Sequence, residues 1–186
     1  MMTFQRDVKT IKERFVIQFL NEARTCTFRE DVPEVIIGGE KLGPFKAGTT
    51  TQFQNWAIER LVAHNLVELD ATEAYESLRR FQNLYNAEEK QPHKLQVFPP
   101  LLYSALIRKV TQLQSDKTSI DPRRHDEIEK IRRMLRILVE NRLSKIMRVA
   151  KSGTNQDRRK QMALEERWLV DELGILLSTW REMVTE

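Results

Sequence analysis

The chain has 186 residues, 40% hydrophobic and 31% charged, a balance typical of a water-soluble protein with one domain or two small ones. Its net charge is +4, and no apolar run approaches the ~20 residues of a membrane helix. The first twelve residues lack the apolar core of a secretory signal. A single cysteine, Cys26, cannot form an internal disulfide, so we expect a buried structural thiol in a cytoplasmic protein, or a nuclear one in a nucleated cell.

A helix followed by a compact β-rich unit is predicted for residues 1–70. Apolar residues three or four apart predict the helix over residues 4–20. Short β-prone runs follow at 25–28, 35–37, 49–53 and 66–69. An apolar helical spacing separates the last two runs. Gly38-Gly39 is typical of a tight hairpin after the second run.

Residues 71–186 are poor in glycine and show the apolar spacing of four helices. The helices are expected near 75–91, after Pro99-Pro100, over 122–150 and over 163–183. Asp121 is the expected N-cap of the third helix, and residues 151–155 are the expected turn into the fourth. Short links favour an antiparallel bundle. The predicted fold class is therefore α+β and mainly α, with a small β-rich domain (1–70) before a C-terminal helical bundle (71–186).

The last predicted helix is apolar over more of its circumference than one narrow face requires. Its apolar residues include Leu169, Val170, Leu173, Ile175, Leu176, Leu177 and Trp180. A helix that is apolar most of the way round is buried on most sides. A helical unit of ~115 residues buries only about two-thirds of its unfolded surface. We therefore expect this helix to pack against another chain in an oligomer.

No pattern typical of a metal site, cofactor site or phosphate loop is present. The histidines are scattered, at His64, His93 and His125, and one cysteine gives no zinc signature. The run Lys151-Ser152-Gly153-Thr154 lacks the glycine spacing and order of a phosphate loop. We expect no metal and no cofactor.

Adjacent carboxylates on the last helix do not predict acid–base catalysis. Glu165-Glu166 and Asp171-Glu172 share one helix, whereas a catalytic pair needs two environments that separate the two pKa values. We interpret these four residues as a solvated face. With no catalytic residue indicated, the chain is not expected to be an enzyme.

Basic residues are concentrated between 123 and 160, a segment that contains 13 Lys or Arg and 5 Asp or Glu, an excess of +8. Such a segment can attract nucleic acid or an acidic protein surface, or it can be an ordinary ion-paired helix surface. Arg142 and Lys145 lie beside the apolar stripe, where an arginine can bury its stem and fork onto a carboxylate across an interface. No aromatic residues are interleaved with these charges, so single-strand stacking is not indicated. A stand-alone DNA-binding protein is the alternative function.

Two groups of motifs resemble archaeal GINS proteins. FREDVPE (28–34) and GEKLGPFKAG (39–48) resemble the small β domain, in which a Pro-Glu pair precedes a hairpin and Gly-Pro-Phe-x-x-Gly follows. ENRLSKI (140–146) with Ala150 resembles the central helix of the GINS helical domain. Residues 164–169 and 173–180 resemble its last helix, and 97–102 the start of an earlier one.

GINS subunits occur in two domain orders, and this chain places the β domain first. That order implies the β-domain-first class. The sequences of the β domain and of the helix carrying Arg142 and Lys145, however, are closer to the other class.

The resemblance implies a non-catalytic scaffold of the DNA-replication machinery. GINS is a four-subunit complex, a helicase accessory factor of the replisome that bridges the MCM helicase and a RecJ-like or Cdc45-like protein. DNA polymerase and primase are further candidate partners, DNA contact is expected to be indirect, and the location is nucleoid-associated. Helical domains build a homo- or heterotetramer, and β domains dock partners. The implied subunit contacts are Arg142, Lys145, Ile146, Trp168, Leu173, Leu176 and Trp180, and the implied docking residues are Pro33, Pro44 and Phe45.

Overall fold

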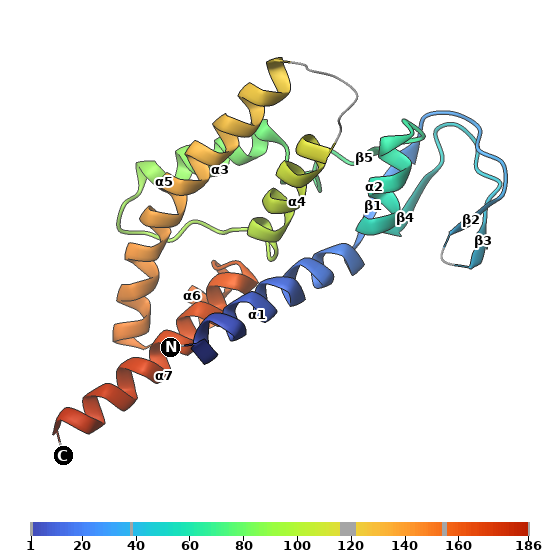
Figure 1. Cartoon of the computed structure of the whole chain (residues 1–186). Coiled ribbons are helices and arrows are strands. Elements are labelled where there is room, and N and C mark those ends of the chain that lie inside the picture. The colour runs from blue at the N-terminus through green and yellow to red at the C-terminus, as the bar shows by residue number, and fades with distance from the viewer. Residues whose placement is uncertain (1, 38, 116–121, 154–155, 186) are drawn as a thin grey trace. The chain divides into compact units, whose positions relative to one another are not determined.

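The computed structural model describes residues 2–37, 39–115, 122–153 and 156–185 (Figure 1). The chain divides into two compact units, Met1–Tyr75 and Glu76–Glu186. The first contains a three-stranded antiparallel sheet, and the second is helical. The predicted α+β, mainly α fold, with a helical bundle after a β-rich unit, is confirmed. In the described residues, no helix combines the length and apolar character needed to cross a membrane.

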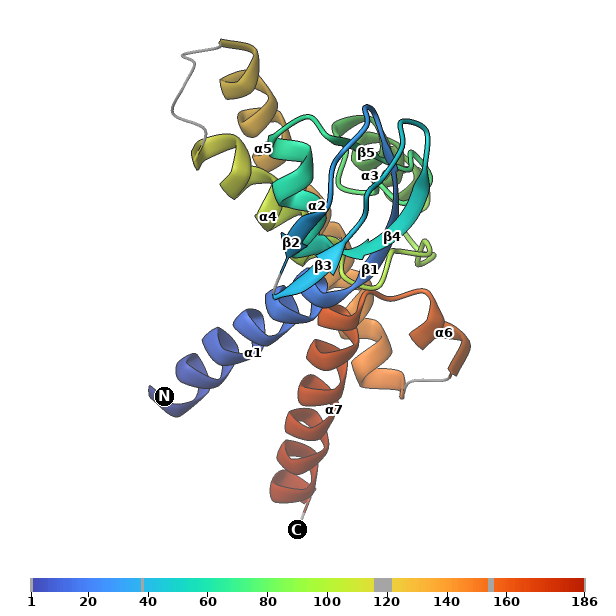
Figure 2. The same ribbon diagram turned by 90° about the vertical axis from the view of Figure 1, so that its right-hand side faces the viewer.

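The first unit places its helices and strands close to the expected positions. They are α1 (Met2–Asn21), β1 (Ala23–Phe28), β2 (Val35–Ile37), β3 (Glu40–Leu42), β4 (Thr50–Gln54), α2 (Asn55–Ala63) and β5 (Val67–Leu69). The sheet has the order β4-β1-β5, and β2 and β3 form a separate hairpin (Figure 2). Gly39 turns this hairpin with a φ of 90°, a conformation that a side chain disfavours. Gly38 lies outside the described residues.

Alternating residues of β1 supply the core of the first unit. Arg24, Cys26 and Phe28 are buried, as the two-residue period of a strand requires. Phe28 packs edge-on against Phe53 of β4, and the core continues into α2. The prediction of a buried thiol is confirmed, because Cys26 is 0% exposed. Burial, with a contribution from Glu73, raises the pKa of this thiol.

The end of α1 is fastened to the β-rich unit by buried polar contacts. Asn55 is 0% exposed and donates from Nδ2 to the carbonyl of Phe19, at 2.7 Å. Its Oδ1 accepts a hydrogen bond from Nε of Arg24, whose guanidinium lies over the rings of Phe19 and Tyr75. Because the side chain of Asn55 serves as donor and acceptor at once, α1 and the sheet are held by one buried polar centre.

The second unit is built around its longest helix. Its elements are α3 (Leu78–Lys90), α4 (Leu102–Ser115), α5 (Pro122–Ser152), α6 (Gln156–Lys160) and α7 (Leu164–Thr185). Helices α3, α4 and α7 each pack on α5 (Figure 1). The expected N-cap Asp121 lies outside the described residues. The short helix α6 was not expected from the sequence.

Helices α5 and α7 run in the same direction, so the expected antiparallel order is wrong for this pair. Arg142 of α5 pairs with Glu166 near the start of α7, and Arg181 near the end of α7 donates to the carbonyl of Lys151. Residue numbers therefore increase together along both helices. The segment between Ser152 and Leu164 returns the chain before α7 begins, and α6 lies within it. Short-link reasoning failed because α6 stands between α5 and α7 in the chain. Of the expected turn at 151–155, Lys151 and Ser152 belong to α5, and residues 154 and 155 lie outside the described residues.

Candidate subunit interface

Arg142 occupies the centre of the helical unit and is only 1% exposed. Its Nε and Nη2 donate to the two carboxylate oxygens of Glu166, at 2.7 and 2.5 Å. Nη1 donates to Glu88 Oε2 at 3.2 Å, and the guanidinium lies 4.0 Å from the centre of the Phe98 ring. Burial alone would lower the pKa of Arg142, but the hydrogen bond and charge of Glu166, with Glu88, outweigh it and raise that pKa. The residue is therefore a fixed internal cation.

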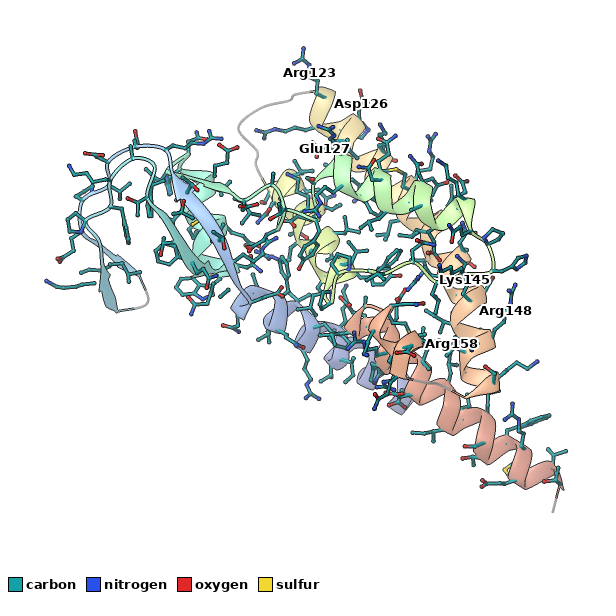
Figure 3. All side chains as sticks on the ribbon, turned by 180° about the vertical axis from the view of Figure 1, so that it is seen from behind. Arg123, Asp126, Glu127, Lys145, Arg148 and Arg158 are labelled. Atoms are coloured by element: carbon teal, nitrogen blue, oxygen red, sulfur yellow. The ribbon has the colours of Figure 1, made fainter. Side chains whose placement is uncertain are left out.

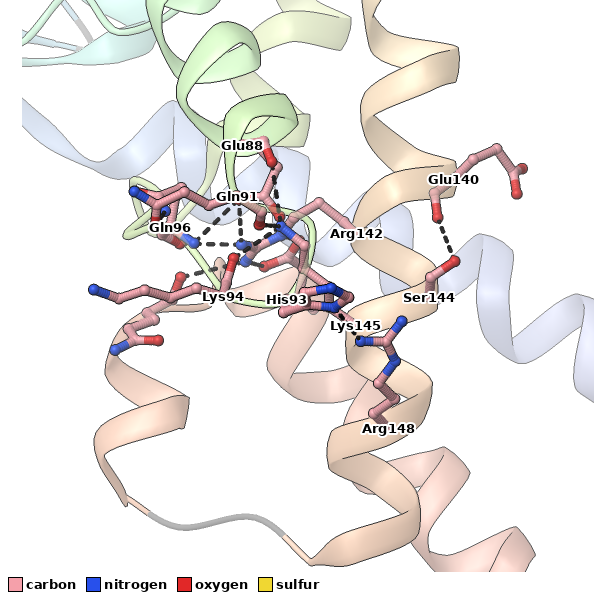
Figure 4. Close-up of polar contacts among 12 residues, drawn as sticks. Glu88, Gln91, His93, Lys94, Gln96, Glu140, Arg142, Ser144, Lys145 and Arg148 are labelled. Atoms are coloured by element: carbon pink, nitrogen blue, oxygen red, sulfur yellow. Dashed lines mark hydrogen bonds and ion pairs between the residues drawn. The ribbon is translucent and has the colours of Figure 1, made fainter.

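Lys145 and Glu88 complete a buried quartet of two cations and two carboxylates with Arg142 and Glu166 (Figure 4). Lys145 Nζ donates to Glu88 Oε1 at 2.5 Å and to the carbonyls of Gln91 and Lys94 at 2.7 and 2.8 Å. These bonds fasten the loop after α3 to α5. We call the four residues the ionic quartet, and it has no net formal charge.

The quartet also fixes the beginning of α7. Glu166 accepts the backbone N–H of Ala163 at 3.0 Å, which caps the first turn of the helix. Tyr103 of α4 donates to Glu166 Oε1 at 2.6 Å, and burial, followed by the charge of Glu166, raises the pKa of Tyr103 well above its usual value. Three elements, α4, α5 and α7, thus meet at one carboxylate, so the direction in which α7 leaves the bundle is set there.

The far half of α7 extends past the packed part of the unit and carries apolar side chains on its surface. Leu176, Trp180 and Met183 are 63%, 58% and 73% exposed. Their i, i+4, i+7 spacing places them on one face of the helix. Ile175 and Val184 are also exposed, at 63% and 61%. We call these five residues the α7 stripe. Single exposed apolar residues are common, whereas a group of this size on one helix makes it a candidate contact surface.

Comparison with known families supplies the identity of the helical unit. The family model described as "Sld5: GINS complex protein helical bundle domain" matches residues 74–185, which cover α3 to α7. The chain belongs to the GINS family. GINS subunits associate with one another and are generally non-catalytic scaffold proteins. A search of curated proteins finds no match. The family match gives no support to the alternative function, a stand-alone DNA-binding protein.

The structure divides the seven expected GINS contact residues into two groups. Arg142, Lys145 and Ile146 are 1%, 4% and 2% exposed inside their own chain, where they offer almost no surface to a partner. Arg142 does fork onto a carboxylate, as expected, but the carboxylate is Glu166 of the same chain. Leu176 and Trp180 lie in the α7 stripe, whereas Trp168 and Leu173 are half-buried.

The interpretation of Glu165 and Glu166 as a solvated face is wrong. Glu166 is 3% exposed, and Glu165 is half-buried with its Oε1 accepting from Ser104 N and Oγ at 3.0 and 2.8 Å. Glu165 Oε2 is buried and has no hydrogen-bond partner among the described residues. Burial raises the pKa of Glu165, although its hydrogen bonds oppose the shift. Asp171 and Glu172 are exposed, as expected for a solvated face.

Helical periodicity could have identified both carboxylates of the ionic quartet as buried residues. Glu88 stands seven residues after Phe81, so it lies on the same buried face of α3. Glu166 is in phase with Val170 and Leu173. A charged residue at an apolar position of a helix implies a buried partner, because an isolated buried charge is too costly.

The three residues expected to dock partners on the β-rich unit also differ in exposure. Pro33 and Pro44 are exposed. The Phe45 ring is half-buried and stacks on Phe28, with ring centres 4.3 Å apart. Phe45 therefore packs against the core of the first unit, and part of its side chain remains accessible. Among the described residues, no group of three or more His, Cys, Asp or Glu side chains is arranged to hold a metal ion.

Proposed function

We propose that the chain is a non-catalytic scaffold subunit of a GINS complex at the DNA replication fork. The observation that carries the proposal is the α7 stripe on a helical unit that belongs to the GINS family. An apolar stripe of this length buries its surface when it meets another apolar helix, at about 25 cal/mol per Å² of apolar area. The partners are other GINS subunits, in a homotetramer or a two-plus-two complex.

The first unit, Met1–Tyr75, is proposed as the docking module of this scaffold. It forms a compact unit with its own hydrophobic core, which supports an independent module, and Pro33 and Pro44 are exposed on it. The proposed clients are the MCM helicase and a RecJ-like or Cdc45-like protein, which the scaffold would bridge. The test is to measure the binding of each client to the purified subunit with and without the first unit. Equal binding by both forms would contradict the docking role.

The assembly is tested by the solution mass of the purified chain, measured by light scattering. One chain has a mass of 22.0 kDa, so four copies give about 88 kDa. A mass near one chain calls for co-expression with a second GINS subunit. If that mixture also yields only single chains, the proposed scaffold role is wrong.

The interface is tested with Leu176→Asp, which places a charge in the centre of the α7 stripe. An uncompensated charge in an apolar contact is strongly unfavourable, so we expect the complex to dissociate. Ser178→Asp is the matched control, because it adds the same charge to an exposed position of the same helix, on the side opposite Leu176. If Leu176→Asp assembles like the control, the stripe is not the subunit contact.

A further inference from the structure

Cations from three segments of the helical unit gather around the last two turns of α5. They are Lys90 and Lys94, which flank the start of the loop after α3, Arg148 and Lys151 of α5, and Arg158 of α6. His93 lies among them. All six are exposed, and we call them the basic end of the unit.

Hydrogen bonds bring these segments together. Lys145 holds the carbonyls of Gln91 and Lys94 against α5, and Arg148 Nη1 lies 3.3 Å from His93 Nδ1 (Figure 4). Arg158 Nη1 donates to Ser152 Oγ at 3.3 Å, which brings α6 to the end of α5. Figure 3 shows Arg148 on the outside of α5, whereas Lys145 belongs to the buried quartet. The basic end is thus a composite of the folded unit and not a run of sequence.

Four cations of the basic end, Lys90, Lys94, Arg148 and Lys151, form no ion pair among the described residues. The ionic quartet balances its own two cations with two carboxylates. Arg159 and Lys160 of α6 pair with Asp171 and Asp157. In the part of the chain that the structure describes, no carboxylate lies within ion-pair distance of Lys90, Lys94, Arg148 or Lys151. These four exposed cations are therefore available to an external anion.

The chemistry of the basic end fits a phosphate backbone. Guanidinium and ammonium groups bind phosphodiester oxygens, and neutralising phosphates releases condensed counterions from the nucleic acid. Apart from His93, the basic end contains no aromatic ring on which a base could stack, so single strands are not favoured. Contacts to phosphates carry no sequence information, so no particular sequence is favoured either. Duplex DNA carries one negative charge per about 1.7 Å of its length, the denser arrangement of anions.

We propose that the basic end binds the backbone of duplex DNA without sequence preference. This goes beyond the scaffold role: the subunit that joins proteins at the α7 stripe also holds the duplex at a different surface. It differs from a stand-alone DNA-binding protein, because the basic end uses only part of the 123–160 segment and adds residues of α3 and the following loop.

The test is a fluorescence anisotropy titration of the full chain with a labelled 20-base-pair duplex at several KCl concentrations. With about four phosphates neutralised, the binding constant should fall roughly 10²-fold between 50 and 200 mM salt. The triple variant Lys94→Gln, Arg148→Gln and Lys151→Gln should make the slope of log K against log salt shallower by about 3. A single strand of the same length should bind more weakly than the duplex.

The matched control removes the same charge from the other half of the same helix. Lys130, Arg133 and Arg136 are exposed cations of α5, and their triple change to Gln should leave most of the affinity intact. Equal losses in the two triple variants would show attraction to overall charge and would overturn the proposal, as would no binding at 50 mM salt. Competition by polyglutamate as effective as by unlabelled duplex would also overturn it, since the surface would then fit an acidic protein. The solution mass of the variants, unchanged from the wild type, separates this result from the fate of the GINS assembly.

Discussion

Removing the guanidinium of Arg142 should destabilise the helical unit by about 3–5 kcal/mol, the typical cost of breaking a buried ion pair by deleting one partner. Arg142→Ala takes away both hydrogen bonds to Glu166 and the one to Glu88, all at side chains no more than 3% exposed. Glu88 keeps Lys145 as a counter-ion, whereas the donors left to Glu166 among the described residues are neutral, Tyr103 and the Ala163 N–H. The penalty therefore falls chiefly on Glu166.

Urea unfolding followed by tryptophan fluorescence measures this penalty. The three tryptophans are Trp56 in the first unit and Trp168 and Trp180 in the second, so a Trp56→Phe background reports on the helical unit alone. Natural domains are stable by only about 5–15 kcal/mol, so a loss of this size lowers the urea midpoint by a large fraction.

A double change provides the control for this reasoning. Arg142→Met combined with Glu166→Leu removes cation and carboxylate together, and apolar replacement of a whole buried pair is often neutral or stabilising. The double variant should therefore be more stable than Arg142→Ala. A loss below about 1 kcal/mol for Arg142→Ala, the scale of a surface pair, would refute the assignment of Arg142 to the centre of the fold.

Two further changes test other buried groups. Glu165 has a folded pKa above its ordinary value, so its contribution to stability is present at low pH and is lost as pH rises through the raised pKa. Glu165→Gln should therefore raise the thermal midpoint at pH 7.5 and leave it unchanged near pH 4; a gain of equal size at both pH values, or in the exposed control Glu172→Gln, would contradict this reasoning. Phe45→Ala should destabilise the β-rich unit by about 2–3 kcal/mol, less than a fully buried phenylalanine, whereas Pro33→Ala should leave its melting temperature within error. If both variants melt like the wild type, Phe45 is a surface residue after all.

Periodicity predicted most of the fold because apolar residues recur at the spacing of the backbone that carries them. The residues Val8, Ile11, Phe15 and Phe19 marked α1, although only Phe19 of the four is buried, and β1 alternates around Cys26. The same reasoning missed α6, whose five residues are all polar or charged, and therefore also missed the return of the chain before α7. Helix direction is a property of the connection, and apolar spacing alone carries no information about it.

The candidate site was only partly predictable for an electrostatic reason. The breadth of the apolar surface predicted that the last helix packs against another chain, and Leu176 and Trp180 of this helix are exposed. Arg142 and Lys145 lay beside an apolar stripe, which is compatible both with an interface and with a core. The choice depends on Glu88, which is 54 residues from Arg142 in the chain, and no local pattern connects the two. Long-range pairing of charges is settled by tertiary structure.

The buried polar centre at Asn55 determines where the chain can be shortened without unfolding the β-rich unit. Its side-chain Nδ2 donates a hydrogen bond to the carbonyl of Phe19, and its backbone N–H donates to the carbonyl of Glu22, at 3.0 Å. A fragment that began at Ala23 would leave Asn55 without either acceptor and would uncover the space that Phe19 fills, although every strand of the sheet would still be present. Dissection of the β-rich unit for binding studies therefore has to retain the last turns of α1, and limited proteolysis should spare the peptide bonds between Phe19 and Arg24.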